Sequence, residues 1–302
     1  MSPRCVRFVN NKFYLNDSGF TVQVKDNKTL LQKYVDNYLY INQNYIYLCG
    51  RGVGQKNIDI EAFNAIKYPR PPLNIQQKIV DEIEDVEKEQ TKLKSQISKL
   101  NQNMQDILTS VYSKYRLGKL GKYTEVPQYG ANVKAIEGNP NFDYRYIRIT
   151  DIDSNGNLLS DWKTAEQIDK KYILDDGDFL FARSGATAGK TFYYTKEKCP
   201  KAIFAGYLIR FKCKKKLIPR FLDVLCKSSI YIKWAETIRG GTAQPNINAQ
   251  QFAAFQIPVP PLAVQQKIVA QIEDWEKQIA EAQAIIDNSR QQKQEILDKY
   301  LK

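Results

Sequence analysis

A glycine-containing loop, Phe181–Thr191, holds the side chains best suited to bind an anion. Its order, Phe-Ala-Arg-Ser-Gly-Ala-Thr-Ala-Gly-Lys-Thr, resembles a phosphate-binding P-loop, which needs four residues between its last two glycines and a helix directly after it. Here three residues separate the glycines, and the aromatic residues that follow predict a strand. Nucleotide hydrolysis through 185–191 is therefore a weak hypothesis. A hairpin turn is the structural alternative. The polar side chains of the loop could instead donate to a DNA phosphate or base edge: Arg183, Ser184, Thr187 and Lys190.

A second polar loop, Arg239–Asn248, has the residue types that recognise bases. Gln and Asn can form two hydrogen bonds with adenine in the major groove, and Arg can do so with guanine. The candidate DNA-binding residues of this loop are Arg239, Thr242, Gln244 and Asn246. The loop has a counterpart at 51–58, and both copies contain Gln-x-Asn-Ile. A structural role is thus an equal alternative, in which Asn248 or Asp59 would N-cap a short helix.

Catalytic and metal-binding patterns are scarce in the rest of the chain. There is no histidine, and the five cysteines are scattered without a Cys-x-x-Cys pair. We therefore expect no catalytic triad, no zinc site and a reducing, cytoplasmic location. Asp175–Asp178 could bind a metal, but the order Asp-Asp-Gly-Asp is more typical of a solvated turn. The sequence predicts no catalytic residue, no metal and no cofactor for this chain.

Charge and composition favour a polyanionic partner. The net charge is +12 and the pI is about 9.2, which suits nucleic acid or an acidic membrane surface, with a solubilising surface as the plain alternative. No run of 18 apolar residues occurs, so no membrane span is predicted. At 302 residues, 43% of them hydrophobic, the chain has room for about two domains.

An internal repeat organises the chain. Residues 52–88 align without a gap on 241–277, and more than half of the aligned positions are identical. The best-matched stretch reads Pro-Pro-Leu-Asn-Ile-Gln-Gln-Lys-Ile-Val at 71–80 and Pro-Pro-Leu-Ala-Val-Gln-Gln-Lys-Ile-Val at 260–269. Each copy continues into a long charged segment. A duplicated unit predicts pseudo-twofold architecture.

Both long segments predict coiled-coil helices. In the first, over about 75–115, apolar residues alternate at spacings of four and three, which is a period of 3.5. A single polar residue, Gln90, interrupts this seam. The seam of the first helix is Ile79, Ile83, Val86, Leu93, Ile97, Leu100, Met104, Ile107 and Val111, and that of the second is Ile268, Ile272, Trp275, Ile279, Ala282 and Ile286, with a weaker tail through Ile296 and Tyr300. We expect the two helices to pair with each other in antiparallel fashion.

The expected fold class is α+β, with four segments at 1–70, 71–116, 117–258 and 259–302. Alternating or aromatic runs predict strands at 20–24, 144–149, 179–181, 191–194 and 207–211, and helices are expected at 29–41 and 218–238. Segment 117–258 is about twice as long as 1–70. Because Phe13–Tyr14 looks like the counterpart of Phe192–Tyr193, we expect the first domain to lack its N-terminal half.

The repeated Pro-x-Pro-Pro-Leu-x-x-Gln-Gln-Lys-Ile-Val stretch before a long helix resembles the DNA-specificity subunit of type I restriction–modification systems. The stretches Gly-Asp-Phe-Leu-Phe-Ala-Arg-Ser-Gly-Ala-Thr-Ala-Gly-Lys at 177–190 and Gly-Thr-Ala-Gln-Pro-Asn-Ile at 241–247 are also typical of this family. The resemblance covers essentially the whole chain. It implies that 117–258 is a complete target recognition domain and that 1–70 is the C-terminal part of another.

This resemblance implies a non-catalytic subunit that binds double-stranded DNA. Each recognition domain would recognise one half of a split site, and the antiparallel helices would set the spacing and dock two modification subunits. S-adenosylmethionine and ATP with Mg²⁺ would belong to the modification and restriction subunits. The alternative is a coiled-coil scaffold whose globular domains bind protein, which the seams alone would support.

Overall fold

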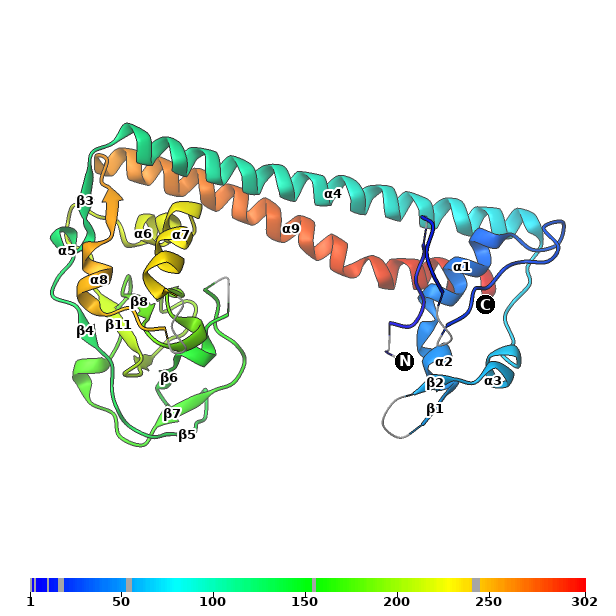
Figure 1. Ribbon diagram of the computed structural model, residues 1–302, viewed down its shortest axis with the longest axis horizontal. Coiled ribbons are helices and arrows are strands. Elements are labelled where there is room, and N and C mark those ends of the chain that lie inside the picture. The colour runs from blue at the N-terminus through cyan, green and yellow to red at the C-terminus, as the bar shows by residue number, and fades with distance from the viewer. Residues whose placement is uncertain are drawn as a thin grey trace. The chain divides into compact units, whose positions relative to one another are not determined.

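The computed structural model describes residues 2, 4–9, 11–15, 19–52, 56–153, 156–240 and 245–302. These residues form two compact units. Unit 1 comprises Met1–Ser98 and Gln278–Lys302, and unit 2 comprises Lys99–Lys277. Each unit therefore includes part of α4 (Leu73–Lys114) and part of α9 (Leu262–Leu301), which are labelled in Figure 1. Both predicted long helices are confirmed, to within a few residues at their ends.

Unit 1 packs short helices against the two long ones. Besides its parts of α4 and α9, it contains α1 (Gln32–Ile41), α2 (Gln43–Leu48), β1 (Gly50–Arg51), β2 (Asn57–Ile58) and α3 (Ile60–Asn64). Its core joins α1 to both long helices through Tyr34, Val35, Ile79, Ile83 and Leu297. The predicted helix at 29–41 is confirmed as α1, although it begins three residues later.

In unit 1, α4 and α9 are antiparallel, as predicted. Glu82 accepts a hydrogen bond from Lys299, and Glu87 accepts one from Lys293, 2.6 Å away. A later residue of α4 thus meets an earlier residue of α9, as antiparallel helices require. Gln90, the polar position of the predicted seam, donates to the Ser289 hydroxyl. Lys293 is nearly buried as well. The apolar tail that looked weak in the sequence is thus partly polar in the folded helix pair.

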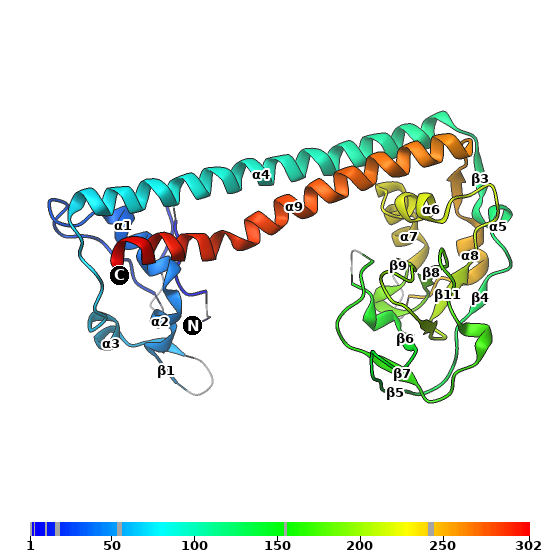
Figure 2. The ribbon, with the colours of Figure 1, turned by 180° about the vertical axis from the view of Figure 1, so that it is seen from behind.

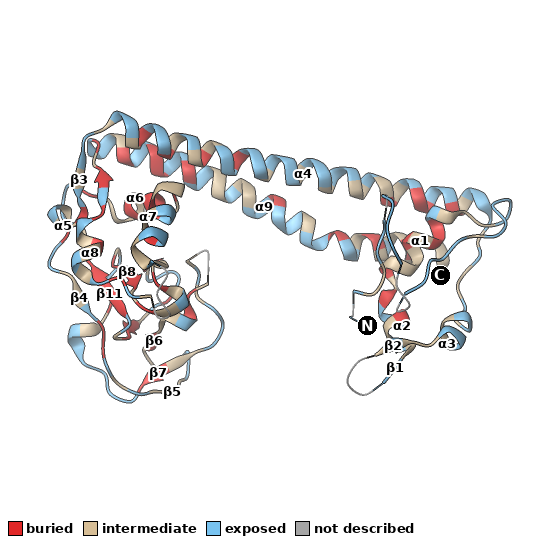
Figure 3. Cartoon of the chain, viewed as in Figure 1, coloured by how far each residue is buried: buried red, intermediate tan, exposed pale blue. Residues whose placement is uncertain are grey.

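Unit 2 is the larger α+β unit, and its main sheet has four strands. Its other described strands pair in three two-stranded sheets, β10-β6, β12-β3 and β5-β7. The order of the main sheet is β4-β11-β8-β9, and every neighbouring pair is antiparallel. Strands β8 and β11 consist of buried residues only, because aromatic and aliphatic side chains pack on both faces (Figure 3). The elements of unit 2 between its parts of α4 and α9 are β3 (Leu117–Lys119), α5 (Leu120–Tyr123), β4 (Gln128–Tyr129), β5 (Ala135–Glu137), β6 (Arg145–Ile147), η1 (Ile149–Asp151), β7 (Lys163–Ala165), η2 (Lys170–Tyr172), β8 (Phe179–Ala182), η3 (Gly185–Thr187), β9 (Thr191–Tyr193), β10 (Ala202–Phe204), β11 (Leu208–Phe211), α6 (Pro219–Cys226), α7 (Ser229–Arg239), α8 (Ala249–Ala254) and β12 (Gln256–Pro258).

Strand β3 follows α4 and pairs with β12, which precedes α9. The two strands are antiparallel, with Gly118 opposite Ile257, and Figure 2 shows them with α5 and α8 below. The predicted strands at 144–149, 179–181, 191–194 and 207–211 are confirmed as β6, β8, β9 and β11.

Three predictions of secondary structure are wrong. The predicted helix 218–238 is two helices, α6 and α7, because the Ser228 side chain caps the second by accepting from the Tyr231 N–H. The strands predicted at 20–24 and at Phe13–Tyr14 are absent from the described part of unit 1. The counterpart of 20–24 in unit 2 is β11, whose neighbours β8 and β4 have no equivalent strands among the described residues of unit 1, so the segment has no strand to pair with.

Candidate nucleic-acid interface

The structure brings the two predicted loops together in unit 2. The Gly185 N–H donates to the Pro245 carbonyl at 2.9 Å, and the Ile247 N–H donates to the Arg183 carbonyl at 2.8 Å. Ser184 also forms an antiparallel bridge with Asn246. Backbone hydrogen bonds of this kind hold residues 183–185 beside residues 245–247. We call the residues Tyr129, Arg183, Ser184, Thr187, Lys190, Tyr207, Arg239 and Asn246 the loop face.

The glycine-rich stretch folds as the tip of the β8–β9 hairpin. It makes one turn of 3-10 helix, η3, in which the Thr187 hydroxyl donates to the Ser184 carbonyl at 2.9 Å. Gly189 has a φ of +90°, and an added Cβ there would lie 2.9 Å from the Ala235 Cβ. Strand β9 follows the turn directly. The hairpin interpretation is therefore confirmed, and the P-loop hypothesis is wrong because a strand occupies the place of the helix that would bind phosphate.

Arg183 contacts one tyrosine through its side chain and another through its backbone. Its guanidinium group is 4.8 Å from the centroid of the Tyr129 ring, a cation–π contact. Its backbone N–H donates to the Tyr207 carbonyl at 2.9 Å, and Tyr207 is 61% exposed. The Arg183 Nε is buried and has no hydrogen-bond partner among the described residues. An arginine beside an exposed aromatic ring can hydrogen-bond with a base or phosphate while the ring stacks or packs against the sugar.

The other predicted residues of these loops differ in burial and in their hydrogen bonds within the protein. Ser184 is buried, whereas Asn246 is exposed. Lys190 donates to the Ile152 carbonyl at 3.3 Å, and Arg239 donates to the Ala188 carbonyl at 3.5 Å. These long contacts hold both cations next to the turn. The remaining two candidates, Thr242 and Gln244, lie outside the described residues.

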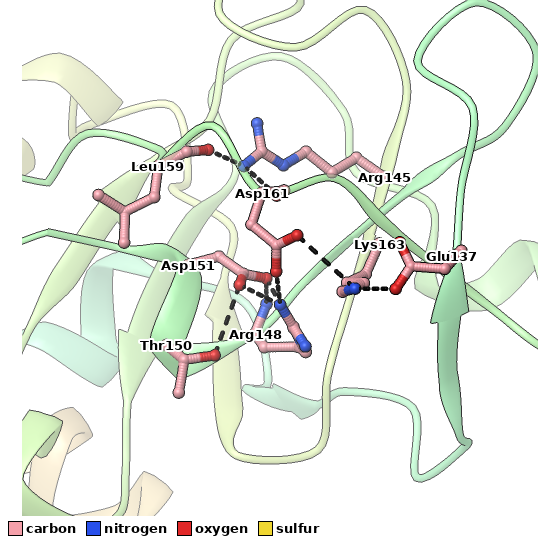
Figure 4. Close-up of polar contacts among 8 residues, drawn as sticks. All are labelled: Glu137, Arg145, Arg148, Thr150, Asp151, Leu159, Asp161 and Lys163. Atoms are coloured by element: carbon pink, nitrogen blue, oxygen red, sulfur yellow. Dashed lines mark hydrogen bonds and ion pairs between the residues drawn. The ribbon is translucent and has the colours of Figure 1, made fainter.

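A network of charged side chains fixes the segment that receives Lys190. Arg148 makes a charge-assisted pair with Asp151 and bonds Asp161 at 2.9 Å, and Lys163 bonds Glu137 (Figure 4). Asp151 is buried, and its hydrogen bond raises the pKa of the Arg148 guanidinium further above its usual value. The network ties η1 to strands β5 and β7. It therefore holds the Ile152 carbonyl in place beside the hairpin tip.

The acidic stretch 175–178 forms a turn, as predicted. Gly177 has a φ of +88°, Asp175 pairs with Lys212 at 2.7 Å, and the buried Asp178 pairs with Arg210 at 3.2 Å. Its carboxylates thus hold the sheet together through ion pairs. Over the described residues no group of three or more Cys, Asp or Glu side chains is placed to hold a metal ion. In the same part of the chain no helix is long and apolar enough to cross a membrane.

The repeated Gln-Gln-Lys motif has a structural role that the sequence did not reveal. In unit 2 the buried Gln265 accepts from the Ile218 N–H at 2.9 Å and donates to the carbonyls of Lys216 and Pro260. In unit 1 the buried Gln76 accepts from the Leu31 N–H at 2.8 Å and donates to the corresponding carbonyls of Thr29 and Pro71. Each glutamine thus links the start of a long helix to the segment before α1 or α6.

The capping alternative for the repeated loop is also confirmed. Asp59 caps α3 by accepting from the Glu61 and Ala62 N–H groups, and Asn248 caps α8 in a capping box with Gln251. In unit 1 the counterpart loop folds as the β1–β2 pair, with Arg51 opposite Asn57. The capping residues of the two loops therefore serve the fold.

The seam residues act mainly within the protein. Ile79 and Ile83 are completely buried in unit 1, as is Ile272 in unit 2, and Ile268, Leu100, Met104, Val111 and Ala282 are buried too. The other apolar positions of the predicted seam are partly buried: Val86, Leu93, Ile97, Ile107, Trp275, Ile279, Ile286, Ile296 and Tyr300. A docking subunit would have to contact faces of the helices other than the buried isoleucines.

Comparisons with known proteins agree with this architecture. The sequence matches the family model "Type I restriction modification DNA specificity domain" over residues 5–102 and 112–288. The type I restriction enzyme MjaVIII specificity subunit of Methanocaldococcus jannaschii is 23% identical over 313 residues, which cover 96% of this chain and 72% of that protein.

Solved structures of such subunits share the fold. The S subunit of a type I restriction–modification system from M. genitalium has a TM-score of 0.54 at 14% identity, covering 92% of this chain and 74% of that one. The HsdS subunit of Thermoanaerobacter tengcongensis has a TM-score of 0.50 at 16% identity, covering 88% and 70%. A chain from a study of complex assembly in the type I system has a TM-score of 0.58 at 16% identity, covering 92% and 72%. By the extent of the family match, the chain belongs to the type I restriction–modification DNA specificity family.

Proposed function

We propose that the chain recognises a DNA sequence through the loop face of unit 2. The observation that carries this proposal is the convergence of two separate polar loops around Arg183, held by the Gly185–Pro245 and Ile247–Arg183 hydrogen bonds. Arg183 and Asn246 have the chemistry to contact base edges, and Lys190 and Arg239 to contact phosphates. Membership in the specificity family supports assigning DNA as the ligand.

The overall charge supports the same ligand. A net charge of +12 draws the chain to a polyanion, and phosphate contacts by lysine and arginine make such binding weaken as salt rises. The exposed Tyr207 and the partly exposed Tyr129 add aromatic surface next to Arg183. Aromatic and basic groups interleaved on one face favour a nucleic acid over an apolar protein surface.

We further propose that this chain contributes recognition and leaves catalysis to its partners. Modification subunits would dock on the solvent-facing sides of α4 and α9 and methylate adenine with S-adenosylmethionine, and restriction subunits would use ATP and Mg²⁺. Helix α4 has 42 residues and α9 has 40, which is about 60 Å each at the α-helical rise. Helices of this length suit a spacer between the two halves of a split DNA site.

Mapping of methylated adenine tests the proposed function. The chain would be expressed with type I modification subunits in cells whose own systems have been deleted, beside the double variant Arg183→Ala/Asn246→Ala. We expect one sequence motif to be methylated with the original chain, and methylation of that motif to be lost or relaxed in the variant. The matched control is Lys196→Ala, an exposed cation at the opposite end of the β8–β9 hairpin. An unchanged motif in the double variant would refute the assignment of the loop face.

A further inference from the structure

Unit 1 contains a cavity of about 740 Å³, and no motif of the sequence predicted it. Its lining comes from Val22–Asp26, from α1, from α3 and from the proline-rich stretch that leads into α4. Aromatic and aliphatic side chains, including Tyr38, Leu39 and Phe63, supply much of the wall. Apolar surface is usually covered in a folded protein. The corresponding surface of unit 2 is covered by a segment of unit 2 itself.

The repeat identifies the equivalent residues. The second repeat follows the first by 189 residues, and the segment before it, 21–35, aligns with 208–222 at an offset of 187, so that Leu30 matches Leu217. The buried glutamines confirm both offsets, because Gln76 binds Leu31 as Gln265 binds Ile218. Residues of the two units can therefore be compared one by one.

In unit 2 the equivalent surface is covered by residues 117–129. Strand β3 pairs with β12, the Leu120 N–H donates to the Phe255 carbonyl at 2.8 Å, and Gly121 approaches Ala253. Further along, Thr124 bridges Cys213, the Glu125 N–H donates to the Lys212 carbonyl at 2.8 Å, and Tyr129 pairs with Ile209. Residues 117–129 thus contact six residues: Ile257, Phe255, Ala253, Cys213, Lys212 and Ile209. Their counterparts in unit 1 all line the cavity: Tyr68, Ile66, Asn64, Asp26, Lys25 and Val22.

Burial differs accordingly between the two units. Ile209, Phe252 and Ile257 are completely buried in unit 2. Their counterparts in unit 1 are Val22, which is 37% exposed, and Phe63 and Tyr68, which are partly exposed. The backbone at 66–69, which corresponds to β12, pairs with no strand of the described residues. An unpaired extended segment beside apolar side chains is the feature that accepts an added strand.

We propose that this cavity binds a strand–helix–strand segment with the chemistry of residues 117–129, in the way that unit 2 binds its own copy. Residues 117–129 themselves are already paired in unit 2. The bound segment should carry an apolar side chain at the position of the fully buried Leu120 and a glycine at that of Gly121, where a Cβ would lie 3.0 Å from the Ala253 Cβ.

The test supplies such a segment to the full chain. A second copy of residues 115–129 is attached after Lys302 through a flexible Gly-Ser linker of about 15 residues, which spans about 20 Å on average. The last turns of α9 belong to the core cluster of unit 1, so the attachment point lies in the right unit.

The readout is amide hydrogen exchange at 21–27 and 67–68, leaving out Val24, whose N–H already donates to the Gln32 side chain at 2.7 Å. Asn27 is included because it corresponds to Lys214, whose N–H donates to the Tyr123 carbonyl at 2.8 Å in unit 2. We expect exchange there to slow by about tenfold or more as amides become hydrogen-bonded to the appended segment.

Two control proteins keep the result specific. In the first, the appended copy carries Leu120→Asp and Gly121→Trp, which remove its apolar anchor and its close approach, and exchange should return to that of the original chain. In the second, Tyr68→Pro in unit 1 removes the N–H at the centre of the accepting segment. The protection gained at 21–27 should then fall, because the appended segment loses one of its backbone hydrogen bonds. Unchanged exchange with the intact appended copy, or equal protection from the altered copy, would overturn the proposal. DNA binding by the loop face of unit 2 does not enter this readout, so either proposal can fail alone.

Discussion

Units 1 and 2 share one way of attaching to a long helix and differ in what is attached. Both use a buried glutamine, Gln76 or Gln265, to hold the segment before a short helix against a proline turn. Only unit 2 carries residues 117–207, which include the hairpin tip of the loop face. The duplicated residues therefore attach each unit to a long helix, and most residues of the proposed loop face lie in the part of unit 2 without a duplicate.

The ion pairs between each short helix and its long helix are duplicated as well, but they differ in burial and in number. Lys33 pairs with Glu84 at 2.6 Å in unit 1, and its counterpart Arg220 pairs with Glu273 at 3.1 Å in unit 2. Arg220 also bonds Asp223 and Glu276 and is mostly buried, whereas the Lys33 side chain is 72% exposed. The same position thus makes one exposed ion pair in unit 1 and a partly buried network in unit 2.

The largest effect should come from breaking the shared glutamine contact. Gln265→Leu would leave the Ile218 N–H and the Lys216 and Pro260 carbonyls buried without partners, and we expect a loss of about 3 kcal/mol in the stability of unit 2. Gln76→Leu should cost unit 1 a similar amount. Hydrogen exchange of the native protein, analysed separately for each unit, measures both values.

The neighbouring glutamines provide matched controls for this prediction. Gln77 and Gln266 follow the buried glutamines directly and are exposed, so replacing either with leucine should change stability little. If Gln76→Leu were as mild as Gln77→Leu, the two units would not share the attachment that the repeat implies.

A smaller and unequal effect is expected from the duplicated ion pairs. Arg220→Met leaves the buried Asp223 with only Lys227, 3.3 Å away, so we expect unit 2 to lose about 2–3 kcal/mol. Lys33→Met should have a much smaller effect, because exposed ion pairs contribute little. Urea denaturation monitored by a probe in each unit would distinguish the two. Equal losses of stability in the two units would show that burial does not make the Arg220 contacts stronger than the Lys33 contact.

The smallest expected effect is a difference in how the units respond to acid. Hydrogen bonds from Lys299 and Tyr300 lower the pKa of Glu82 below its usual 4.5, so its stabilisation of unit 1 is present above that pH and is lost as the pH falls. Burial raises the pKa of Asp178 above 3.8 despite Arg210, so its folded state holds a proton more tightly and unit 2 loses stability as the pH rises through that shifted value.

Stability between about pH 3 and pH 6 would be compared with that of Glu82→Gln and Asp178→Asn. The advantage of the original chain over Glu82→Gln should grow with pH. Its advantage over Asp178→Asn should shrink. If both advantages grew with pH, or both shrank, the opposite pKa shifts of Glu82 and Asp178 would be contradicted.

Sequence patterns predicted the long elements well and the small ones poorly. The 3.5-residue period of 79–111 predicts α4 because one apolar face is sustained over many turns. Strands such as β4 and β12 have two or three residues, too few for any period, and they exist only because tertiary partners pair with them. The alternating stretch 20–24 shows the converse, since a strand-like pattern without a partner forms no strand.

The candidate site was predicted in part for similar reasons. The types of Arg183, Lys190 and Asn246 suggested a recognition surface, and the folded loops bring them together. Tyr129 and Tyr207 were missed because neither belongs to a motif, and only the pairing of β4 and β8 with β11 brings them beside Arg183. The buried glutamines were seen as a family signature, while their role needed the positions of residues far away in the sequence.

The most direct test of the loop face is the affinity of the chain, assembled with its modification subunits, for its own DNA site and for a scrambled duplex at one salt concentration. Arg183→Ala should weaken binding to the site by about 10- to 100-fold and should lower the ratio of the two affinities by the same factor, because a base contact is worth about 1–3 kcal/mol. Lys196→Ala should leave the ratio of the two affinities unchanged. An unchanged ratio in Arg183→Ala, or an equal loss in both variants, would contradict recognition by this face.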